Sequence, residues 1–368
     1  MKHIKIIAGI WTVAVCLIWS CTDNVEVKEK PIITINTQPE TTTNVAVGSI
    51  TGSLSVSASV TQGATLSYQW YSNTTNSNTG GSEISGATSA SFTIPATLAA
   101  GTYYYFCEVR ATGEATSVRS NVATVNSVSI EMVSVQGGTF TMGCTAEQGS
   151  DCYNNEIPVH EVTLNSFSIG KYQVTQVLWV AVMGSNPSGF KDDNLPVETV
   201  SWNDIVGTSG ESEVINGITY YANGFIFKLN QLAGKKYRLP TEAEWEFAAR
   251  GGNQSAGYKY SGSNTIGDVA WYKDNNNPNG TKPVGTKTPN ELGIYDMSGN
   301  VYELCSDWYG GYTADAKKNP TGPATGSARV NRGGSWSYDA ANCRVTIRSG
   351  SNPDYRDDNL GFRMALSL

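Results

Sequence analysis

The sequence predicts an all-β sandwich followed by a second domain of mixed α+β structure, and two observations carry this prediction. From Ile32 to Val125, apolar and polar residues alternate in short runs separated by Gly, Ser and Asn, without a helical period. After about Ile130 the sequence changes to tryptophans, Gly-rich loops and a few segments with helical spacing. The chain has 368 residues, 39% of them hydrophobic, which is enough to bury two separate cores.

The N-terminus is typical of a bacterial lipoprotein signal peptide. Two lysines precede an apolar run from Ile6 to Trp19, which is short for a membrane span and ends at "LIWSC". Ile18 and the small residue directly before Cys21 resemble a lipobox. We therefore expect residues 1–20 to be removed, Cys21 to carry lipid, and residues 21–36 to form a polar tether. A plain signal peptide or a signal anchor is the alternative.

Charge and cysteine content set the expected compartment and partners. The net charge is -7, only 15% of residues are charged, and no Lys/Arg cluster follows the first residues, so nucleic acid is not an expected partner. The predicted lipid is the expected membrane contact, at the bacterial outer membrane or cell surface. Five of the seven cysteines lie beyond Cys21, so at least one thiol stays free or pairs with another chain.

Residues 37–126 form the predicted sandwich. Within it, Trp70 lies in an alternating strand-like run, and Tyr105 lies two residues before Cys107. These residues resemble an immunoglobulin-like domain, in which Trp70 would be the core tryptophan and Tyr105 the tyrosine corner. The partner cysteine expected near Ala58 is missing, so we expect Cys107 to be a buried thiol. No catalytic or metal-binding spacing occurs here, which favours a spacer that lifts the next domain off the membrane.

Residues 130–368 form the second predicted domain, in which three helices are expected. One begins at the possible N-cap Thr175 and ends at Gly184, and another ends at Gly234. The third has the clearest start signal, a capping box made by Thr241 and Glu244. The remainder of this domain is predicted to be rich in loops.

Seven short motifs follow one another in this domain. They are "VQGGTFTMG" from Val135, "EIPVHEVTL" from Glu156, "PVETVSW" from Pro196, "RLPTEAEWEFAARGG" from Arg238, "NELGIYDMSGNVYEL" from Asn290, "RGGSW" from Arg332 and "NLGFR" from Asn359. In this order they resemble the formylglycine-generating enzyme family, also called the sulfatase-modifying factor domain. The resemblance implies an α+β C-type lectin-like fold over about two thirds of the chain.

The resemblance also implies a catalytic centre that this sequence does not complete. The family enzymes oxidise a substrate cysteine with copper(I), which is held by two thiolates after a Gly-Gly-Ser segment. Ser335 and Cys343 match that segment, but Tyr338 replaces the first cysteine, and Tyr302 replaces a tryptophan of the oxygen pocket. One thiolate cannot hold copper(I) linearly, so neither copper nor formylglycine generation is expected and no catalytic residue is assigned. An oxidase that uses Cys343 alone remains open.

The segment "YDMSGNVYEL" predicts a calcium site. Calcium prefers carboxylates together with backbone carbonyls from a tight Gly-containing loop, and the resemblance assigns this role to Asp296, Gly299, Val301 and Glu303. The alternative is a turn in which Asp296 caps neighbouring amides.

Other titratable residues are given structural interpretations. His160 is the only histidine besides the one in the predicted signal peptide, so a His-based metal site or triad lacks ligands, and a hydrogen-bonded structural role is expected. Glu242, Glu244 and Glu246 are expected to be cap and surface residues.

Two disulfides are considered for an oxidising compartment. Cys144 and Cys152 bracket a short polar loop that a disulfide would close. Cys305 could pair with Cys343 in the same way, which would make Cys343 structural.

The C-terminal segment has an unusual composition. Residues 337–358 are rich in Ser, Tyr, Asp, Asn and Gly and contain no Lys, Glu, Gln, Met or Trp. Substitution of the adenines of an AAC codon never yields those five residue types, so the segment resembles the variable proteins of diversity-generating retroelements. Asn-rich loops of ordinary non-catalytic relatives are the alternative. The candidate contact residues are Trp336, Ser337, Tyr338, Asp339, Thr346, Ile347, Ser349, Ser351, Asp354, Tyr355, Asp357 and Asp358.

Three hypotheses of function follow. The favoured one is a surface-anchored, non-catalytic lipoprotein that binds an unknown protein or glycan, because Tyr and Trp give rigid contact area while Ser, Asn and Asp give adaptable hydrogen bonds. A divergent formylglycine-generating oxidase is the first alternative. A structural accessory lipoprotein of the cell envelope is the second.

Overall fold

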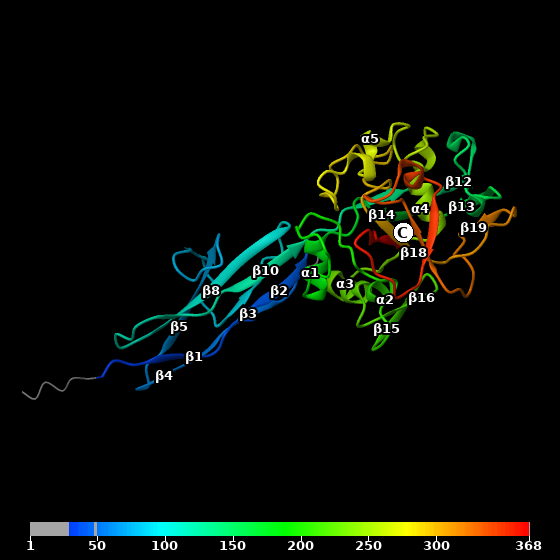
Figure 1. Cartoon of the computed structure of the whole chain (residues 1–368). Coiled ribbons are helices and arrows are strands. Elements are labelled where there is room, and N and C mark those ends of the chain that lie inside the picture. Colours follow the sequence, from blue (N-terminus) through cyan, green and yellow to red (C-terminus); the bar gives the residue numbers. More distant parts are fainter. Residues whose placement is uncertain (1–28, 48–49, 368) are drawn as a thin grey trace, which may run out of the picture.

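The computed structural model describes residues 29–47 and 50–367 (Figure 1). The predicted signal peptide and the predicted lipidation residue Cys21 lie outside the described residues. Among the helices of the described ranges, none combines the length and the apolar character needed to cross a bilayer.

The N-terminal part is an elongated domain built from strands (Figure 1). One sheet has the order β2-β10-β8-β5-β6, with β9 beside β8, while β1 pairs with β4 and β3 with β7. The strands are β1 (Ile33–Thr37), β2 (Thr42–Ala46), β3 (Ser53–Ser55), β4 (Ser57–Val60), β5 (Leu66–Asn73), β6 (Ser82–Glu83), β7 (Ser91–Thr93), β8 (Gly101–Ala111), β9 (Val118–Arg119) and β10 (Ala123–Val128).

The core of this domain contains the residues that the sequence singled out. Trp70 on β5 lies opposite Cys107 on β8, and both are fully buried. Cys107 is a free thiol, as predicted. Ile33 is also buried and pairs with Val60, so the domain begins at Ile33 and not at residue 37. The predicted tether therefore ends too late, because its last residues complete the core.

The two domains share a continuous apolar contact. Ala46 at the end of β2 and Val128 at the end of β10 belong to the same buried cluster as side chains of α1 and α3. The backbone N–H of Val47 donates to the carbonyl of Val128 at 2.9 Å, which extends the pairing of these strand ends up to the second domain. Burial of these residues fixes the strand domain against the helices.

The second domain is mixed α+β, as predicted. Its helices are α1 (Gln176–Met183), α2 (Trp202–Val206), α3 (Phe225–Ala233), α4 (Glu242–Ala249) and α5 (Ile266–Val269). Its strands are β11 (Met132–Val135), β12 (Gly138–Met142), β13 (His160–Leu164), β14 (Phe167–Gly170), β15 (Ser212–Ile215), β16 (Ile218–Tyr221), β17 (Tyr237–Arg238), β18 (Tyr302–Trp308), β19 (Lys317–Lys318), β20 (Arg329–Arg332), β21 (Arg348–Ser351), β22 (Leu360–Gly361) and β23 (Ala365–Ser367).

The predicted helices α1, α3 and α4 are confirmed, although the side chain of Thr175, the N-cap residue of α1, accepts no capping hydrogen bond. Gly184 and Gly234 adopt the left-handed conformation directly after α1 and α3. At the start of α4, the Thr241 hydroxyl accepts from the N–H of Glu244, and the Glu244 carboxylate accepts from the N–H of Thr241. The capping box is therefore complete on both sides.

Two small sheets and α4 carry the region of interest. Strands β21, β20, β18 and β22 form one sheet, and β12, β13 and β19 form another. Trp245 of α4 is fully buried, in one cluster with Val162 of β13 and Val330 of β20. The loops after β20 and β21 leave this supported sheet and carry the segment 333–359.

Candidate ligand-binding site

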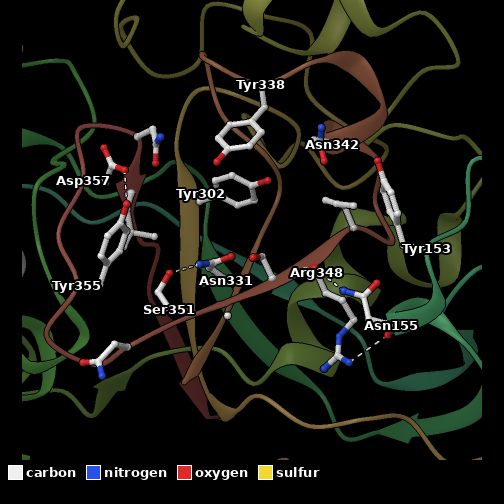
Figure 2. A pocket seen from close by; sticks show the side chains of 16 residues that line it. Tyr153, Asn155, Tyr302, Asn331, Tyr338, Asn342, Arg348, Ser351, Tyr355 and Asp357 are labelled. Atoms are coloured by element: carbon white, nitrogen blue, oxygen red, sulfur yellow. Dashed lines mark hydrogen bonds between the residues drawn. The ribbon is translucent and has the colours of Figure 1, made fainter. Parts of the chain in front are cut away.

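A cavity of about 510 Å³ opens beside β18, β20 and β21 (Figure 2). Tyr302, the first residue of β18, meets the ring of Tyr338 edge to face, with 5.2 Å between the ring centroids. Asn331 of β20 donates from Nδ2 to the Ser351 Oγ of β21 at 2.7 Å. Rigid strands thus hold polar and aromatic side chains around one hollow, which is the general form of a small binding site.

Half of the predicted contact residues line this cavity. They are Tyr338, Ile347, Ser349, Ser351, Tyr355 and Asp357. Trp336, Ser337, Asp339, Asp354 and Asp358 lie outside its lining.

The residues outside the lining have other partners or stay exposed. Trp336 is half-buried and donates from Nε1 to the carbonyl of Asp358 at 3.1 Å. Asp339 is exposed and pairs with Lys273 at 3.1 Å. Asp354 is exposed as well. These side chains surround the cavity without forming its wall.

Thr346 requires a correction, because it is completely buried. Its hydroxyl donates to Glu156 Oε2 at 2.5 Å and lies 3.2 Å from Gln148 Oε1. A side chain that holds two distant segments together beneath the surface cannot contact a ligand.

Sequence reasoning missed several lining residues, including Tyr153, Asn155 and Asn331. The first two belong to the segment before β13, nearly 200 positions from the C-terminal loops. Asn331 lies opposite Ser349 in the β20–β21 register. That pairing would have revealed Asn331 once both strands were known, whereas no local signal marks Tyr153 or Asn155.

The predicted disulfide between Cys144 and Cys152 is present, with 5.8 Å between the Cα atoms. Tyr153, directly after it, lines the cavity and is 46% exposed. The disulfide therefore closes the loop that precedes one wall of the site.

Buried ion pairs support the cavity from below. Arg348 lines it, but its guanidinium faces Glu242, with Nε and Nη2 each 2.7 Å from a carboxylate oxygen. Burial alone would raise the pKa of Glu242, but Arg348 and Arg332 outweigh that effect and lower it. Nη1 of Arg348 donates to the carbonyls of Asn155 and Gly310. This guanidinium is fully engaged by the protein.

The surface role predicted for the three glutamates of α4 is wrong. Glu242 and Glu246 are buried, and Glu246 pairs with Arg332 and with Arg250. Glu244 is also buried and makes a bidentate pair with Arg238, at 2.7 Å to each oxygen. Each glutamate is compensated by an arginine, which is how buried carboxylates are tolerated.

The rim of the cavity carries uncompensated acid. Tyr355 donates its hydroxyl to Asp357 Oδ2 at 2.5 Å, and this bond together with burial raises the pKa of Tyr355 to about 12. Burial, followed by the neighbouring Asp357, raises the pKa of Asp358. Burial likewise raises the pKa of Tyr302. The phenols are therefore neutral at physiological pH, and the carboxylates dominate the charge of the rim.

Comparison with known proteins identifies the family. The model of the "Sulfatase-modifying factor enzyme 1-like domain" matches residues 119–368. The chain belongs to this family. The second domain accordingly has the C-type lectin-like fold expected from the motifs, and the family match begins slightly before the predicted boundary at residue 130.

Relatives of this family differ in their described roles. "Chaperone protein LppX" of Paenibacillus barcinonensis is 38% identical over 242 residues, which are 57% of this chain and 79% of the relative. The "Formylglycine-generating enzyme" of Streptomyces coelicolor is 32% identical over 301 residues, covering 63% of this chain and 88% of that enzyme. Among solved structures, "Treponema denticola variable protein 1" shares 31% identity and a TM-score of 0.54, covering 69% of this chain and 97% of that one.

At the two positions where the family has copper-binding cysteines, this chain has one cysteine and one tyrosine. Cys343 is fully buried, and burial raises the pKa of its thiol to about 12. Tyr338 stands at the other position and turns into the cavity (Figure 2). A single protonated thiol beside a phenol does not fit copper(I), which needs two thiolates.

The suggested disulfide between Cys305 and Cys343 is not formed. Both are free, buried thiols. Cys305 lies in the cluster around Trp245, whereas Cys343 packs with Tyr260 and Val269 in a separate cluster. Cys343 is a core residue behind the Gly-Gly-Ser segment, where its Sγ lies 4.0 Å from the carbonyl of Ser335.

The oxygen atoms of the four predicted calcium ligands converge on one point, which the side chain of Gln173 occupies in this structure. Gln173 Nε2 lies 3.2, 3.5 and 3.0 Å from the carbonyl oxygens of Asp296, Gly299 and Val301, and 3.0 Å from Glu303 Oε1. Three carbonyls and a carboxylate form a donor set that suits calcium. In this structure the Gln173 NH2 group is directed at the same oxygens, whereas Gln173 Oε1 and Asp296 Oδ1 are buried acceptors without a partner among the described residues. These unpaired acceptors fit a cation once the Gln173 amide turns. Calcium could enter only if Gln173 turned its oxygen inward or left.

His160 has the structural role expected of it. The side chain is buried, its Nδ1 lies 3.3 Å from the carbonyl of Pro158, and the ring meets Tyr312 edge-on. The described residues contain no group of three or more His, Cys, Asp or Glu side chains that could hold a metal ion.

Proposed function

We propose that this chain is a lipoprotein that binds a protein or glycan ligand at the cavity beside β18, β20 and β21 and performs no chemistry there. One observation carries the proposal: six contact residues chosen from composition line a single cavity on the same segment where the family places its copper thiolates. The tyrosine and asparagine side chains there resemble the contact residues of antibody paratopes. The similarity to a Treponema variable protein supports the same interpretation.

A ligand screen tests this proposal. The full chain would be probed with a glycan array and with random peptides displayed on phage. Ser349→Arg fills the cavity from β21 and should abolish recovered binding, whereas Ser212→Arg places the same side chain on the exposed strand β15 and should not. Binding that both variants retain would contradict the assignment of the site.

We further propose that a retroelement diversifies the coding stretch for residues 336–363 at its adenines, with Trp336 and the segment 360–363 as fixed residues at its two ends. Five residue types are missing from the window 337–358, and all six predicted contacts that line the cavity come from this window. The genomic test is a nearby reverse transcriptase gene and a second copy of this coding stretch that differs only at adenines. A locus with neither would overturn diversification while leaving ligand binding in place.

The N-terminal part, up to the end of β10, is proposed to present the site at the cell surface. A lipid on Cys21 would anchor the chain, and the strand domain, interpreted as an immunoglobulin-like spacer, would extend the second domain away from the membrane. Its buried contact with α1 and α3 suits a stiff spacer. We expect labelled palmitate to be incorporated into the wild-type chain and not into the Cys21→Ser variant. Labelling of both would place the lipid elsewhere.

A formylglycine-generating oxidase is the second candidate, because family membership and the Streptomyces relative favour it. The test is oxygen uptake by the full chain with a cysteine-containing peptide, with and without added copper. We expect no uptake above that of Cys343→Ala, since the lone thiol is buried and protonated. Copper-dependent uptake that Cys343→Ala removes would establish the oxidase instead.

A further inference from the structure

The charged groups of the cavity do not cancel. Its charged lining residues are Arg348 and Asp357. The Arg348 guanidinium is buried and neutralised by Glu242. Asp357 has no ion-pair partner within the described residues; its carboxylate accepts from the Tyr355 hydroxyl and from the N–H of Asp358. The second carboxylate, Asp358, follows directly at the rim. The site therefore presents net negative charge to an incoming ligand.

Aromatic faces surround this charge. Tyr302, Tyr338 and Tyr355 line the cavity, and Tyr338 and Tyr355 are 41% and 47% exposed. Figure 2 shows Tyr355 next to Asp357 on one side and the Tyr302–Tyr338 pair on another. The faces of such rings carry partial negative charge and attract ammonium and guanidinium groups. The fourth ring, Tyr153, already has Arg344 5.6 Å from its centroid, which is the same interaction made internally.

Among the buried side-chain atoms of the lining, those without a hydrogen-bond partner are of one kind. Asn155 Oδ1 and Asn331 Oδ1 are buried acceptors without a partner in the described part of the chain. The amide groups of both side chains already donate, from Asn155 to the Tyr309 hydroxyl and from Asn331 to Ser351. Two buried acceptors therefore lack the N–H or O–H donors that buried polar atoms normally have.

We propose that the cavity receives a cationic group rich in N–H donors, namely the ammonium or guanidinium group of a lysine or arginine side chain on a partner protein. This inference rests on the proposed ligand-binding function and narrows its ligand class. The carboxylate, the tyrosine faces and the unpaired amide oxygens each favour that group, whereas an anionic ligand would meet Asp357 and Asp358 unscreened. A peptide segment is the occupant because lysine and arginine side chains carry these cationic groups, which neutral glycans lack.

Phage-displayed random peptides selected on the full chain test the proposal. We expect a preferred position at which Lys and Arg exceed their share in the input library severalfold. A synthetic copy of the selected peptide should bind about tenfold more weakly to Asp357→Asn, which keeps the acceptor and removes the charge. Asp315→Asn, an exposed carboxylate outside the cavity lining, is the matched control and should bind as the wild type does.

The possible outcomes separate this inference from the function on which it rests. If Ser349→Arg abolishes the binding of the selected peptides but these peptides carry no excess of Lys or Arg, the cationic ligand class is overturned. The assignment of the binding site then still holds. Equal affinity for wild type and Asp357→Asn would overturn the cationic ligand class as well. If no selected peptide loses binding to the Ser349→Arg variant, the inference of a protein partner is overturned. A glycan-array signal that Ser349→Arg abolishes would then still support the assignment of the binding site. Binding of free arginine amide as tight as that of the peptide would identify a small amine as the ligand.

Discussion

The side-chain nitrogen Nε2 of Gln173 lies 3.0 Å from Glu303 Oε1, at the point where three backbone carbonyls also converge. Glu303 is further held by Arg363, with 2.6 and 2.7 Å between the paired atoms, and it accepts from Trp245 Nε1 at 2.6 Å. An arginine therefore already balances the glutamate charge. A neutral amide at the centre adds no charge to this buried cluster, whereas calcium would add two positive charges, which the buried carboxylate of Asp296 would offset only in part.

Calcium removal is the first prediction. We expect a chelator to leave the melting temperature of the wild-type chain unchanged, because Gln173 fills the cage without metal. Gln173→Ala vacates the cage and should create a calcium-dependent rise in melting temperature. The check is a thermal melt of both chains with chelator and with calcium, supported by elemental analysis. One bound calcium per wild-type chain, lost together with stability on chelation, would show that Gln173 turns its oxygen to the metal.

The ion pair beneath the cavity gives the second prediction. Arg348→Ala leaves Glu242 buried with only the more distant Arg332 for compensation, at 3.4 Å. We expect a loss of about 3 kcal/mol in the free energy of unfolding, measured by urea denaturation. The exposed pair Lys273–Asp339 is the control, since Lys273→Ala should cost less than about 1 kcal/mol. Similar losses for both variants would mean that the buried pair does not support the site.

Local signals in the sequence predicted local structure well. The capping box of α4 needs only Thr241 and Glu244, three positions apart, and the stop of α1 needs only Gly184. The Cys144–Cys152 loop is likewise a short-range feature. Such elements are visible in a single sequence because the interacting groups are neighbours along the chain.

Long-range contacts explain what the sequence did not predict. Glu242 was expected at the surface, yet its partner Arg348 lies 106 positions away. Asn155 enters the cavity from a segment 193 positions before Arg348. Thr346 was chosen because of the composition of its segment, yet it is buried, and its hydroxyl donates a hydrogen bond to the distant Glu156. A pattern of residue types cannot reveal which remote segments meet, so the walls of the site required the fold.

Asp307 gives a pH-dependent prediction. It is buried beside Glu242, and burial followed by that neighbour raises its pKa from 3.8 to about 7. The folded chain then holds this proton more tightly than the unfolded chain, so the stabilisation is present below about pH 4 and lost as the pH rises through 7. Asp307→Asn removes the titration. The stability of this variant relative to wild type should increase with pH, by at most about 1.4 kcal/mol per unit.

Urea denaturation at several pH values between 4 and 8 measures this difference. Asp315→Asn, an exposed carboxylate, is the matched control, and its stability relative to wild type should not vary with pH. A constant difference for Asp307→Asn as well would show that this carboxyl is ionised throughout the range.

The disulfide beside the cavity gives the last prediction. Cys144 and Cys152 close a loop that ends directly before Tyr153, a wall of the site. Replacing both cysteines by serine frees this loop in the unfolded chain, so we expect a loss of about 2–3 kcal/mol in the free energy of unfolding. Greater mobility of the Tyr153 ring should also weaken the binding of a selected peptide severalfold, because the ring must then be ordered when the peptide binds. Dithiothreitol should reproduce both effects in the wild type and change neither in the double variant. Unchanged affinity despite lower stability would show that Tyr153 is held by its contacts with Arg344 and not by the disulfide.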